Sequence, residues 1–394
     1  MTNKSPIVLA AGGTGGHIFP AESLAEELVL RGEMVVMITD KRFADYNSAS
    51  YEGVIGTLPI HYIHAGSLGG SLVKKIKGGI GIIRGTLQAR QLLKTLKPKA
   101  VVGFGGYPSF PTMLAATQLG LNTVIHEQNS VLGKANRSLC GRVKRIATTY
   151  PQTQRLPQSC EGKTVLTGNP VRAAIRALHH VPYPMLEADG TLRLLVVGGS
   201  QGAQVFSSVV PEAIRLLPES LRGRIRLDQQ ARAADQDGVK EAYKKLGMQV
   251  DVAPFFADIP ARLAAAHLII SRAGASTVAE LSCAGRPAVL VPYPQATDNH
   301  QYFNAQAIED VGGGWLMPQE GFTAAALAAR LEAALTLPSS LSKAAESMRS
   351  LGHLNAAKDL ADMVLNLSAE ADRNQSNPSS KEQQTSDSQK EKAA

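Results

Sequence analysis

The sequence predicts an α/β protein built from two doubly wound, Rossmann-like domains that face each other across a cleft. Three observations support this fold class. Apolar runs end in glycine-rich turns three times, at residues 7–17, 100–107 and 194–202. Short apolar runs alternate with helical stretches, which is the rhythm of βαβ units. The chain has 394 residues, enough for two domains with separate cores.

Each glycine-rich turn suggests the same chemistry. A buried strand that breaks into glycines before a helix brings bare backbone N–H groups close to a ligand. The N-terminus of that helix favours negative charge, so phosphate is the expected ligand. One such turn is a weak signal. Three of them, divided between the two halves of the chain, indicate two domains that meet phosphorylated ligands at one cleft.

The first domain is expected over residues 1–170. Its first helix follows Gly16, repeats Leu24 and Leu28 on one face and stops at Gly32. Its strands are predicted from apolar runs at 6–11, 34–39, 100–104, 122–126, 144–148 and 163–167.

The second domain is expected over residues 171–345. Its strands are predicted at 192–198, 225–228, 249–252, 267–270, 288–291 and 314–317. Residues 323–367 are rich in Ala and Leu and predict two helices separated near Pro338. Residues 369–394 have no apolar periodicity and cannot bury enough surface to offset their ordering entropy, so a disordered tail is expected there.

The charge of the chain is unevenly distributed. The formal net charge is +8; residues 1–171 hold 19 Lys and Arg against 9 Asp and Glu, a net of +10, whereas residues 172–368 hold 18 against 19, a net of −1. No acidic residue lies between Glu52 and Glu127. This asymmetry indicates that the first half meets an anionic partner or surface.

Cysteine spacing and apolar segment length restrict the class of protein. Cys140, Cys160 and Cys283 form no CxxC pair, so a reduced, cytosolic protein without structural zinc is expected. No signal-peptide pattern precedes the first predicted strand. No apolar stretch approaches the ~20 residues of a membrane-spanning helix.

The densest group of functional side chains lies at residues 271–280, directly after an apolar strand. Small residues there leave room for a ligand, and Ser and Thr side chains with free N–H groups can hold a diphosphate. Glu280 can accept hydrogen bonds from both hydroxyls of a ribose. The polar cluster at 298–305 is suited to binding the hydroxyls of a sugar.

Seven motifs, in order, resemble those of the bacterial MurG-type transferase family: residues 12–17 with Phe19-Pro20, 103–107, 126–129, 168–172, 198–203, 271–280 and 298–305. The resemblance covers roughly residues 5–365. It implies a GT-B fold, with a C-terminal helix at 346–368 that crosses back to the first domain. It also implies transfer of N-acetylglucosamine (GlcNAc) from UDP-GlcNAc to lipid I, which gives lipid II for peptidoglycan at the cytoplasmic face of the inner membrane, with roles in cell shape and division.

The resemblance assigns a role to individual residues. Thr14, Gly15 and Gly16 lie on the diphosphate side of the cleft, Asn129 and Gln301 contact GlcNAc, and Arg172 and Ser200 hold the diphosphate and uridine. The nucleotide sugar is lined by Ala275, Ser276, Thr277, Val278, Ala279 and Glu280, with Glu280 on the ribose. Phe256 falls where the family has an aliphatic residue against uracil, and Ser276 replaces a common Leu. Separately, because the cationic segment lies just before the second glycine turn, we assign the acceptor diphosphate to Gly103, Gly105, Gly106 and Tyr107.

The expected reaction inverts the anomeric centre, because the 4-hydroxyl of the acceptor sugar displaces UDP directly. A base must take the hydroxyl proton. His17 is the first candidate because its side chain titrates near neutral pH, and Glu127 is the alternative. Each could instead have a structural role, as a helix cap or a hydrogen-bonding anchor.

No protein-bound metal and no other cofactor is expected. The sequence has one DxD pattern, Asp235-Gln236-Asp237, and it lies in a polar stretch with no preceding apolar strand. The charge of the leaving diphosphate would then be stabilised by Arg172 and by helix N-termini.

The basic segment before the second glycine turn has three interpretations. Apolar residues alternate with cations at near-helical spacing, which suits an anionic membrane surface. The proposed membrane patch comprises Leu72, Lys74, Lys75, Ile76, Lys77 and Ile80. Frequent glycines argue against one continuous helix, so a flexible loop that grips the acceptor diphosphate is an alternative. A merely solvated basic face is the third.

Other functions explain less of the sequence. A UDP-GlcNAc 2-epimerase shares the architecture but needs no basic membrane-facing segment. A nucleic-acid-binding protein is disfavoured because no recognised module is present and aromatic residues are sparse in the basic stretch. A nicotinamide dehydrogenase leaves residues 271–280 unexplained, with only Asp40 placed near the end of the second strand.

Overall fold

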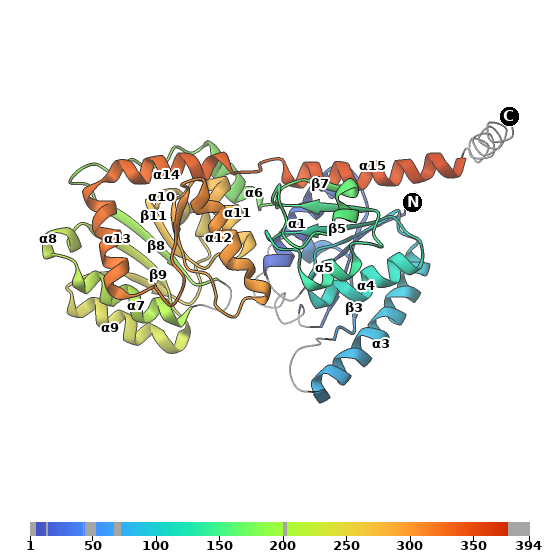
Figure 1. Cartoon of the computed structure of the whole chain (residues 1–394), viewed down its shortest axis with the longest axis horizontal. Helices are drawn as coiled ribbons and strands as arrows, with labels where there is room; N and C mark the ends of the chain where they lie inside the picture. The colour runs from blue at the N-terminus through green and yellow to red at the C-terminus, as the bar shows by residue number, and fades with distance from the viewer. Residues whose placement is uncertain are drawn as a thin grey trace.

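The computed structural model describes residues 5–12, 15–41, 43, 53–66, 72–199 and 203–376. The chain forms two α/β lobes, each with a parallel sheet enclosed by helices (Figure 1). The N-terminal lobe holds the first half of the chain and its last helix, and the C-terminal lobe holds the rest. This architecture confirms the predicted fold class.

The sheet of the N-terminal lobe has the order β3-β2-β1-β4-β5-β6-β7, and all of its pairings are parallel. The central strands are fully buried on both faces, which is why their sequences are continuous apolar runs. The strands are β1 (Ile7–Ala10), β2 (Val35–Asp40), β3 (Ile60–Ile63), β4 (Ala100–Gly103), β5 (Thr123–Glu127), β6 (Arg145–Thr148) and β7 (Thr164–Leu166). The helices are α1 (Gly15–Leu30), α3 (Leu72–Leu96), α4 (Gly106–Gln118) and α5 (Lys134–Leu139).

The sheet of the C-terminal lobe has the order β10-β9-β8-β11-β12-β13, again wholly parallel. Its strands are β8 (Leu192–Val197), β9 (Ile225–Gln230), β10 (Asp251–Ala253), β11 (Leu268–Ser271), β12 (Ala288–Leu290) and β13 (Gly314–Leu316). Its helices, after the connecting α6 (Ala173–Arg176), are α7 (Gln204–Leu216), α8 (Glu219–Arg222), α9 (Gln236–Lys245), α10 (Ile259–Ala265), α11 (Ala275–Ala284), α12 (His300–Asp310), α13 (Ala324–Thr336) and α14 (Pro338–Ser350).

Both sheets reverse their strand order at an internal point. In the N-terminal lobe the reversal lies between β1 and β4, and in the C-terminal lobe it lies between β8 and β11. Ligands of open parallel sheets bind outside the carboxyl ends of the strands at such a reversal. The three glycine-rich turns follow β1, β4 and β8, so they are at these two points.

Three local expectations were wrong. Strand β3 was missed because only Ile63 of its residues is buried, which leaves no continuous apolar run. Helix α1 begins at Gly15, slightly before the expected start after Gly16. Helix α3 is continuous from Leu72 to Leu96 despite its glycines. At Gly85 the glycine is required by close packing, because a Cβ there would overlap the carbonyl oxygen of His64.

The C-terminal segment also differs from the expectation. Helix α14 ends at Ser350, and a separate helix α15 (Ala356–Ser376) lies along the N-terminal lobe (Figure 1). Leu360, Val364 and Leu367 of α15 join the apolar core of that lobe. Residues 369–376, expected to be disordered, continue this helix; the rest of the expected tail lies outside the described residues.

Candidate active site

A single cleft between the lobes receives the turns that follow β1, β4, β8 and β11. Its volume is about 1800 Å³. Pockets for one small molecule measure roughly 300–1,000 Å³. The cleft therefore has room for two ligands at once.

Most of the predicted site residues line this cleft. From the N-terminal lobe these are Gly15, Gly16, His17, Gly105, Gly106, Tyr107, Glu127 and Asn129. From the rest of the chain they are Arg172, Phe256, Ala275, Ser276, Thr277, Glu280 and Gln301. Thr14 and Ser200 lie outside the described residues.

Three predicted residues do not line the cleft. Gly103 ends strand β4, where a Cβ would lie 2.5 Å from Cγ of Met113, so packing requires the glycine there. Val278 is buried in the core of the C-terminal lobe. Ala279 packs against the same core.

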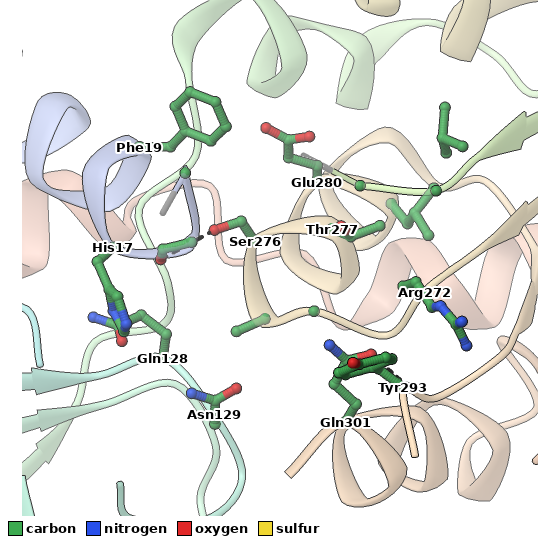
Figure 2. Close-up of a pocket in the computed structure, with 18 of the residues that line it drawn as sticks. His17, Phe19, Gln128, Asn129, Arg272, Ser276, Thr277, Glu280, Tyr293 and Gln301 are labelled. Carbon is green, nitrogen blue, oxygen red and sulfur yellow. Dashed lines mark hydrogen bonds between the residues drawn. The ribbon is translucent and has the colours of Figure 1, made fainter. Parts of the chain in front are cut away.

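His17 lies near the start of α1, beside the second glycine turn. A Cβ on Gly106 would come within 3.2 Å of the imidazole Nε2, so this glycine leaves space for the ring. Burial lowers the pKa of His17, although the Glu127 carboxylate, the Gln128 side chain and the Phe104 carbonyl partly oppose that shift. His17 is therefore neutral at neutral pH, the form that accepts a proton. Figure 2 shows it on the N-terminal wall beside Gln128.

Glu127, at the end of β5, is held by four hydrogen bonds. Its Oε1 accepts from the backbone N–H and the Nδ2 of Asn129, both at 3.1 Å. Its Oε2 accepts from the Gly133 N–H at 2.9 Å and from Asn136 Nδ2 at 2.8 Å. With both oxygens occupied and the residue buried, this carboxylate anchors the loop between β5 and α5. The geometry favours the anchoring role for Glu127 over proton transfer.

His126 and Gln128 extend the network behind this wall, and neither was assigned a role from the sequence. The Nε2–H of His126 donates to the Gly168 carbonyl at 2.9 Å, and its Nδ1 accepts from Gln128 Nε2 at 3.0 Å. Burial lowers the pKa of His126 to about 4, so the ring is neutral. Gln128 Nε2 also donates to the Phe104 carbonyl at 2.9 Å. These bonds tie the end of β5 to the turns that follow β4 and β7.

Arg172 and Glu280 form an ion pair on the opposite side of the cleft. Arg172 donates to Glu280 Oε1 from Nε at 3.0 Å and from Nη2 at 2.6 Å. The ring centroid of Phe19 lies 4.3 Å from the guanidinium carbon, a cation–π contact across the lobes. Burial raises the pKa of Glu280, and Arg172 offsets part of that shift. Arg172 and Glu280 are thus each other's charged partners in the structure.

The N-terminus of α11 contacts the first glycine turn. The hydroxyl of Ser276 donates to the Gly16 carbonyl at 3.3 Å, a contact that crosses the cleft (Figure 2). The Ser276 hydroxyl therefore has a polar partner in the opposite lobe.

Arg272 and Tyr293 border the cleft near Gln301 and were not singled out from the sequence (Figure 2). Arg272 donates to the Pro292 carbonyl at 3.1 Å and to Gln319 Oε1 at 2.7 Å. Burial lowers the pKa of Arg272, but the group stays a cation at neutral pH. The backbone N–H of Tyr293 donates to Gln301 Oε1 at 2.9 Å, which orients the Gln301 amide.

The two adjacent aromatic residues after β10, Phe255 and Phe256, differ in exposure, although the sequence placed Phe256 against the base. Phe256 is 4% exposed, and the Arg262 guanidinium stacks 4.0 Å from its ring centroid. Its neighbour Phe255 is 73% exposed and lines the cleft. Phe255 is therefore the aromatic ring available to stack on a base. The adjacent Pro254 carbonyl accepts from Gln230 Nε2 at 3.0 Å, and Gln230 Oε1 accepts from the Gly198 N–H at 3.0 Å.

Within the described residues, no group of three or more His, Cys, Asp and Glu side chains is arranged to hold a metal ion. Of the DxD pattern, Asp235 forms an ion pair with Arg232 at 2.7 Å. Asp237 is in the first turn of α9.

Helix α3 presents an apolar and basic face outside the cleft. Ile76, Ile80, Ile83 and Leu87 are exposed, and Lys77 lies among them. The side chains of Leu72, Lys74 and Lys75 lie outside those that the structure describes. In the described part of the chain, no helix has the length and hydropathy needed to cross a bilayer.

Comparisons with known proteins agree with this geometry. Residues 7–148 match the model of the glycosyltransferase family 28 N-terminal domain, and residues 193–364 match that of the C-terminal domain. A protein of Rhodospirillum centenum is 52% identical over 92% of this chain and 94% of its own length. It is named UDP-N-acetylglucosamine–N-acetylmuramyl-(pentapeptide) pyrophosphoryl-undecaprenol N-acetylglucosamine transferase.

Solved structures show the same relationship. The crystal structure of Acinetobacter baumannii MurG is 30% identical, has a TM-score of 0.72 and covers 92% of this chain and 100% of its own. The UDP-GlcNAc 2-epimerase of Neisseria meningitidis, at 14% identity and a TM-score of 0.61 over 92% of this chain and 100% of its own, shares the fold alone. Both halves of the chain match the family models, and a close relative matches nearly all of it. The chain belongs to glycosyltransferase family 28.

Proposed function

We propose that this chain transfers GlcNAc from UDP-GlcNAc to the 4-hydroxyl of the acetylmuramoyl sugar of lipid I, forming lipid II for peptidoglycan. The observation that carries this proposal is one large cleft where the ligand-binding ends of both sheets meet, in a chain 52% identical to a transferase of that name. One wall serves the nucleotide sugar and the other serves the lipid-linked acceptor.

The C-terminal lobe, residues 171–345, binds the donor. Phe255 stacks on uracil, Glu280 accepts the ribose hydroxyls, and Gln301 faces the sugar. All three line the cleft. The N-terminus of α11, which begins at Ala275, supplies N–H dipoles to the diphosphate.

The N-terminal lobe, residues 1–170, binds the acceptor. Gly105 and Gly106 have φ of 80° and 72°, a conformation that favours glycine, and they open the N-terminus of α4 toward the cleft. We assign the acceptor diphosphate to this turn, with Tyr107 beside it. The exposed α3 face then meets the anionic cytoplasmic surface of the membrane from which the lipid-linked acceptor extends, so the protein is peripheral to that membrane.

Chemistry takes place between the two walls. The acceptor oxygen bonds to C1 of GlcNAc, its proton passes to the neutral His17, and UDP leaves with the electrons of the broken C1–O bond. The Glu127 charge favours the imidazolium that forms, because that charge raises the pKa of His17. Arg172, released from Glu280 by the ribose, stabilises the leaving diphosphate. The proposed mechanism uses these side chains and no metal ion held by the protein.

Turnover with purified protein tests this function. UDP-GlcNAc and a lipid I analogue are expected to give UDP and the disaccharide lipid, with no UDP released when the acceptor is omitted. The donor sugar is recovered and analysed in the same assay. Release without acceptor, or appearance of the 2-epimer, contradicts the transferase and supports the epimerase alternative.

A further inference from the structure

The segment that enters helix α12 crosses from the C-terminal lobe to the N-terminal lobe. Asp298 accepts from Arg155 Nη1 at 2.6 Å and from Arg137 Nη1 at 3.5 Å, and both arginines belong to the N-terminal lobe. Burial raises the pKa of Asp298, but these arginines outweigh that and hold it below its ordinary value. The backbone turns sharply here, with φ of 56° at Asp298 and 55° at Asn299.

In the second turn of α12, Asn304 makes a second crossing. It is fully buried. Its Oδ1 accepts from the backbone N–H of Ser130 at 2.9 Å and from the Ser130 hydroxyl at 3.0 Å. Its Nδ2 donates to Asn129 Oδ1 at 3.1 Å and to the Ala273 carbonyl at 3.1 Å. A primary amide has two N–H donors and two acceptor lone pairs, so all four are used.

Asn129 is therefore held from both lobes. Its Nδ2 donates to Glu127 of its own lobe, and its Oδ1 accepts from Asn304 of the other. The amide keeps one N–H and one lone pair, and the residue lines the cleft (Figure 2). If the lobes separated, the bond to Asn304 would break, and Asn129 could rotate while still bound to Glu127.

These contacts form a closed loop of partners that links the two lobes at the cleft. Asn136 of α5 holds Glu127, and its neighbour Arg137 pairs with Asp298. Asp298 leads into α12, and Asn304 of α12 returns to Asn129. The orientation of the Asn129 amide therefore depends on the same contacts that hold the two lobes together.

We propose that Asn304 is a positioning residue for recognition of the donor sugar. It sets the Asn129 amide so that the remaining N–H and lone pair face a hydroxyl or acetamido group of GlcNAc, and it does so only when the lobes are closed. This inference rests on the proposed function, because it requires GlcNAc in the cleft. Beyond that function, Asn304 of the donor-binding lobe acts on the sugar through Asn129, a side chain of the acceptor-binding lobe.

The isosteric variant Asn304→Asp tests this role. Its carboxylate still accepts from Ser130, but it presents an oxygen to Asn129 Oδ1 in place of a donor. Because a misplacement of about 1 Å can cost about a hundredfold in rate, kcat/KM for UDP-GlcNAc is expected to fall roughly tenfold to a hundredfold. The affinity for UDP, which lacks the sugar, is expected to stay unchanged in calorimetry.

Two further variants separate positioning from stability. Ser130→Ala removes one contact to Asn304 but leaves its bond to Asn129, so it is expected to retain most of the turnover. The double variant Asn129→Ala/Asn304→Asp is expected to be no slower than Asn129→Ala alone, because Asn304 acts through Asn129. If the losses from the two substitutions multiply in the double variant, the inference is wrong. It is also wrong if Asn304→Asp loses as much affinity for UDP as it loses in kcat/KM.

Failure of this inference can be told apart from failure of the proposed function. If the unmodified chain does not turn over UDP-GlcNAc, the proposed function itself fails. If it does, and Asn304→Asp matches it in kcat/KM, only the role of Asn304 is wrong. Thermal unfolding checks that each variant is folded, and Asn304→Ser, smaller and uncharged, replaces Asn304→Asp if that variant is not.

Discussion

The two walls of the cleft are built on different physical principles. On the N-terminal wall, the Glu127 carboxylate is held by hydrogen bonds from its own lobe, and His126 and Gln128 bond to backbone carbonyls of that lobe. The C-terminal wall places the ion pair of Arg172 and Glu280 and the exposed ring of Phe255 at the surface of the cleft. The Glu127 carboxylate is thus fixed without a ligand, whereas the C-terminal wall holds groups that a ligand can redirect.

This difference matches the demands of the two halves of the reaction. Groups that act in the transition state are most effective when they need no reorganisation, which a satisfied network provides. A donor with a ribose and a diphosphate instead needs an acceptor and a cation, and Arg172 and Glu280 supply both once they separate. The comparison therefore predicts catalytic defects on one wall and donor-binding defects on the other.

The largest expected effect is on His17. We expect His17→Ala to lower kcat by about a thousandfold, within the range of general-base catalysis, while the affinity for UDP is retained. Single-turnover kinetics with saturating donor measures this. If His17→Ala keeps near-normal turnover and Glu127→Ala does not, the base is on Glu127 and the comparison between the walls needs revision.

Glu127→Gln tests whether the N-terminal wall acts through charge as well as geometry. Replacing one oxygen by NH₂ opposes a bound N–H donor, so kcat is expected to fall about tenfold to a hundredfold. Because the Glu127 charge raises the pKa of His17, its removal is expected to lower that pKa further.

The pH profile of kcat/KM shows in which direction the pKa of His17 shifts in Glu127→Gln. In the unmodified chain the rate falls on the acid side as His17 becomes protonated, below its ordinary pKa of 6.5. In Glu127→Gln that acid limb is expected at lower pH. A shift to higher pH would contradict the electrostatic role.

The contrast in charge extends to the outer surfaces. Neutralising Lys77 and Arg84 on the exposed face of α3 with Gln is expected to weaken binding to vesicles of anionic lipid by roughly thirtyfold, since each cation near such a surface contributes about 1 kcal/mol. Vesicle sedimentation measures the change. The matched control is Lys244→Gln/Lys245→Gln on α9 of the C-terminal lobe, which is expected to bind as the unmodified chain does. Equal losses would remove the assignment of α3 to the membrane.

The smallest effect is expected on the donor wall. Glu280→Gln keeps the size of the side chain but removes its charge, which frees Arg172 while weakening the contact to ribose. KM for UDP-GlcNAc is expected to rise about tenfold, with a much smaller change in kcat, because the lost hydrogen bonds to an ionised group act in binding. Steady-state kinetics with varied donor measures the split. A fall in kcat alone would place Glu280 in the chemical step.

The sequence by itself determined the two parallel sheets, the cleft and the family. Buried strands are continuous apolar runs, and the turns that end them need glycine where φ is positive or backbones approach closely, so both are visible over a few consecutive residues. The motifs that hold Glu280 and Gln301 are local in the same way. Their order along the chain identified the family.

Only the tertiary structure decided what depends on residues far apart in sequence. The glycines of α3 predict a broken helix until Gly85 is seen against the His64 carbonyl. Nothing local distinguishes Phe255 from Phe256, because Arg262 and the core select which ring is buried. The pairing of Asn129 with Asn304 joins residues from opposite lobes. Such contacts form only when two separate cores bring their surfaces together, and no short stretch of sequence specifies that arrangement.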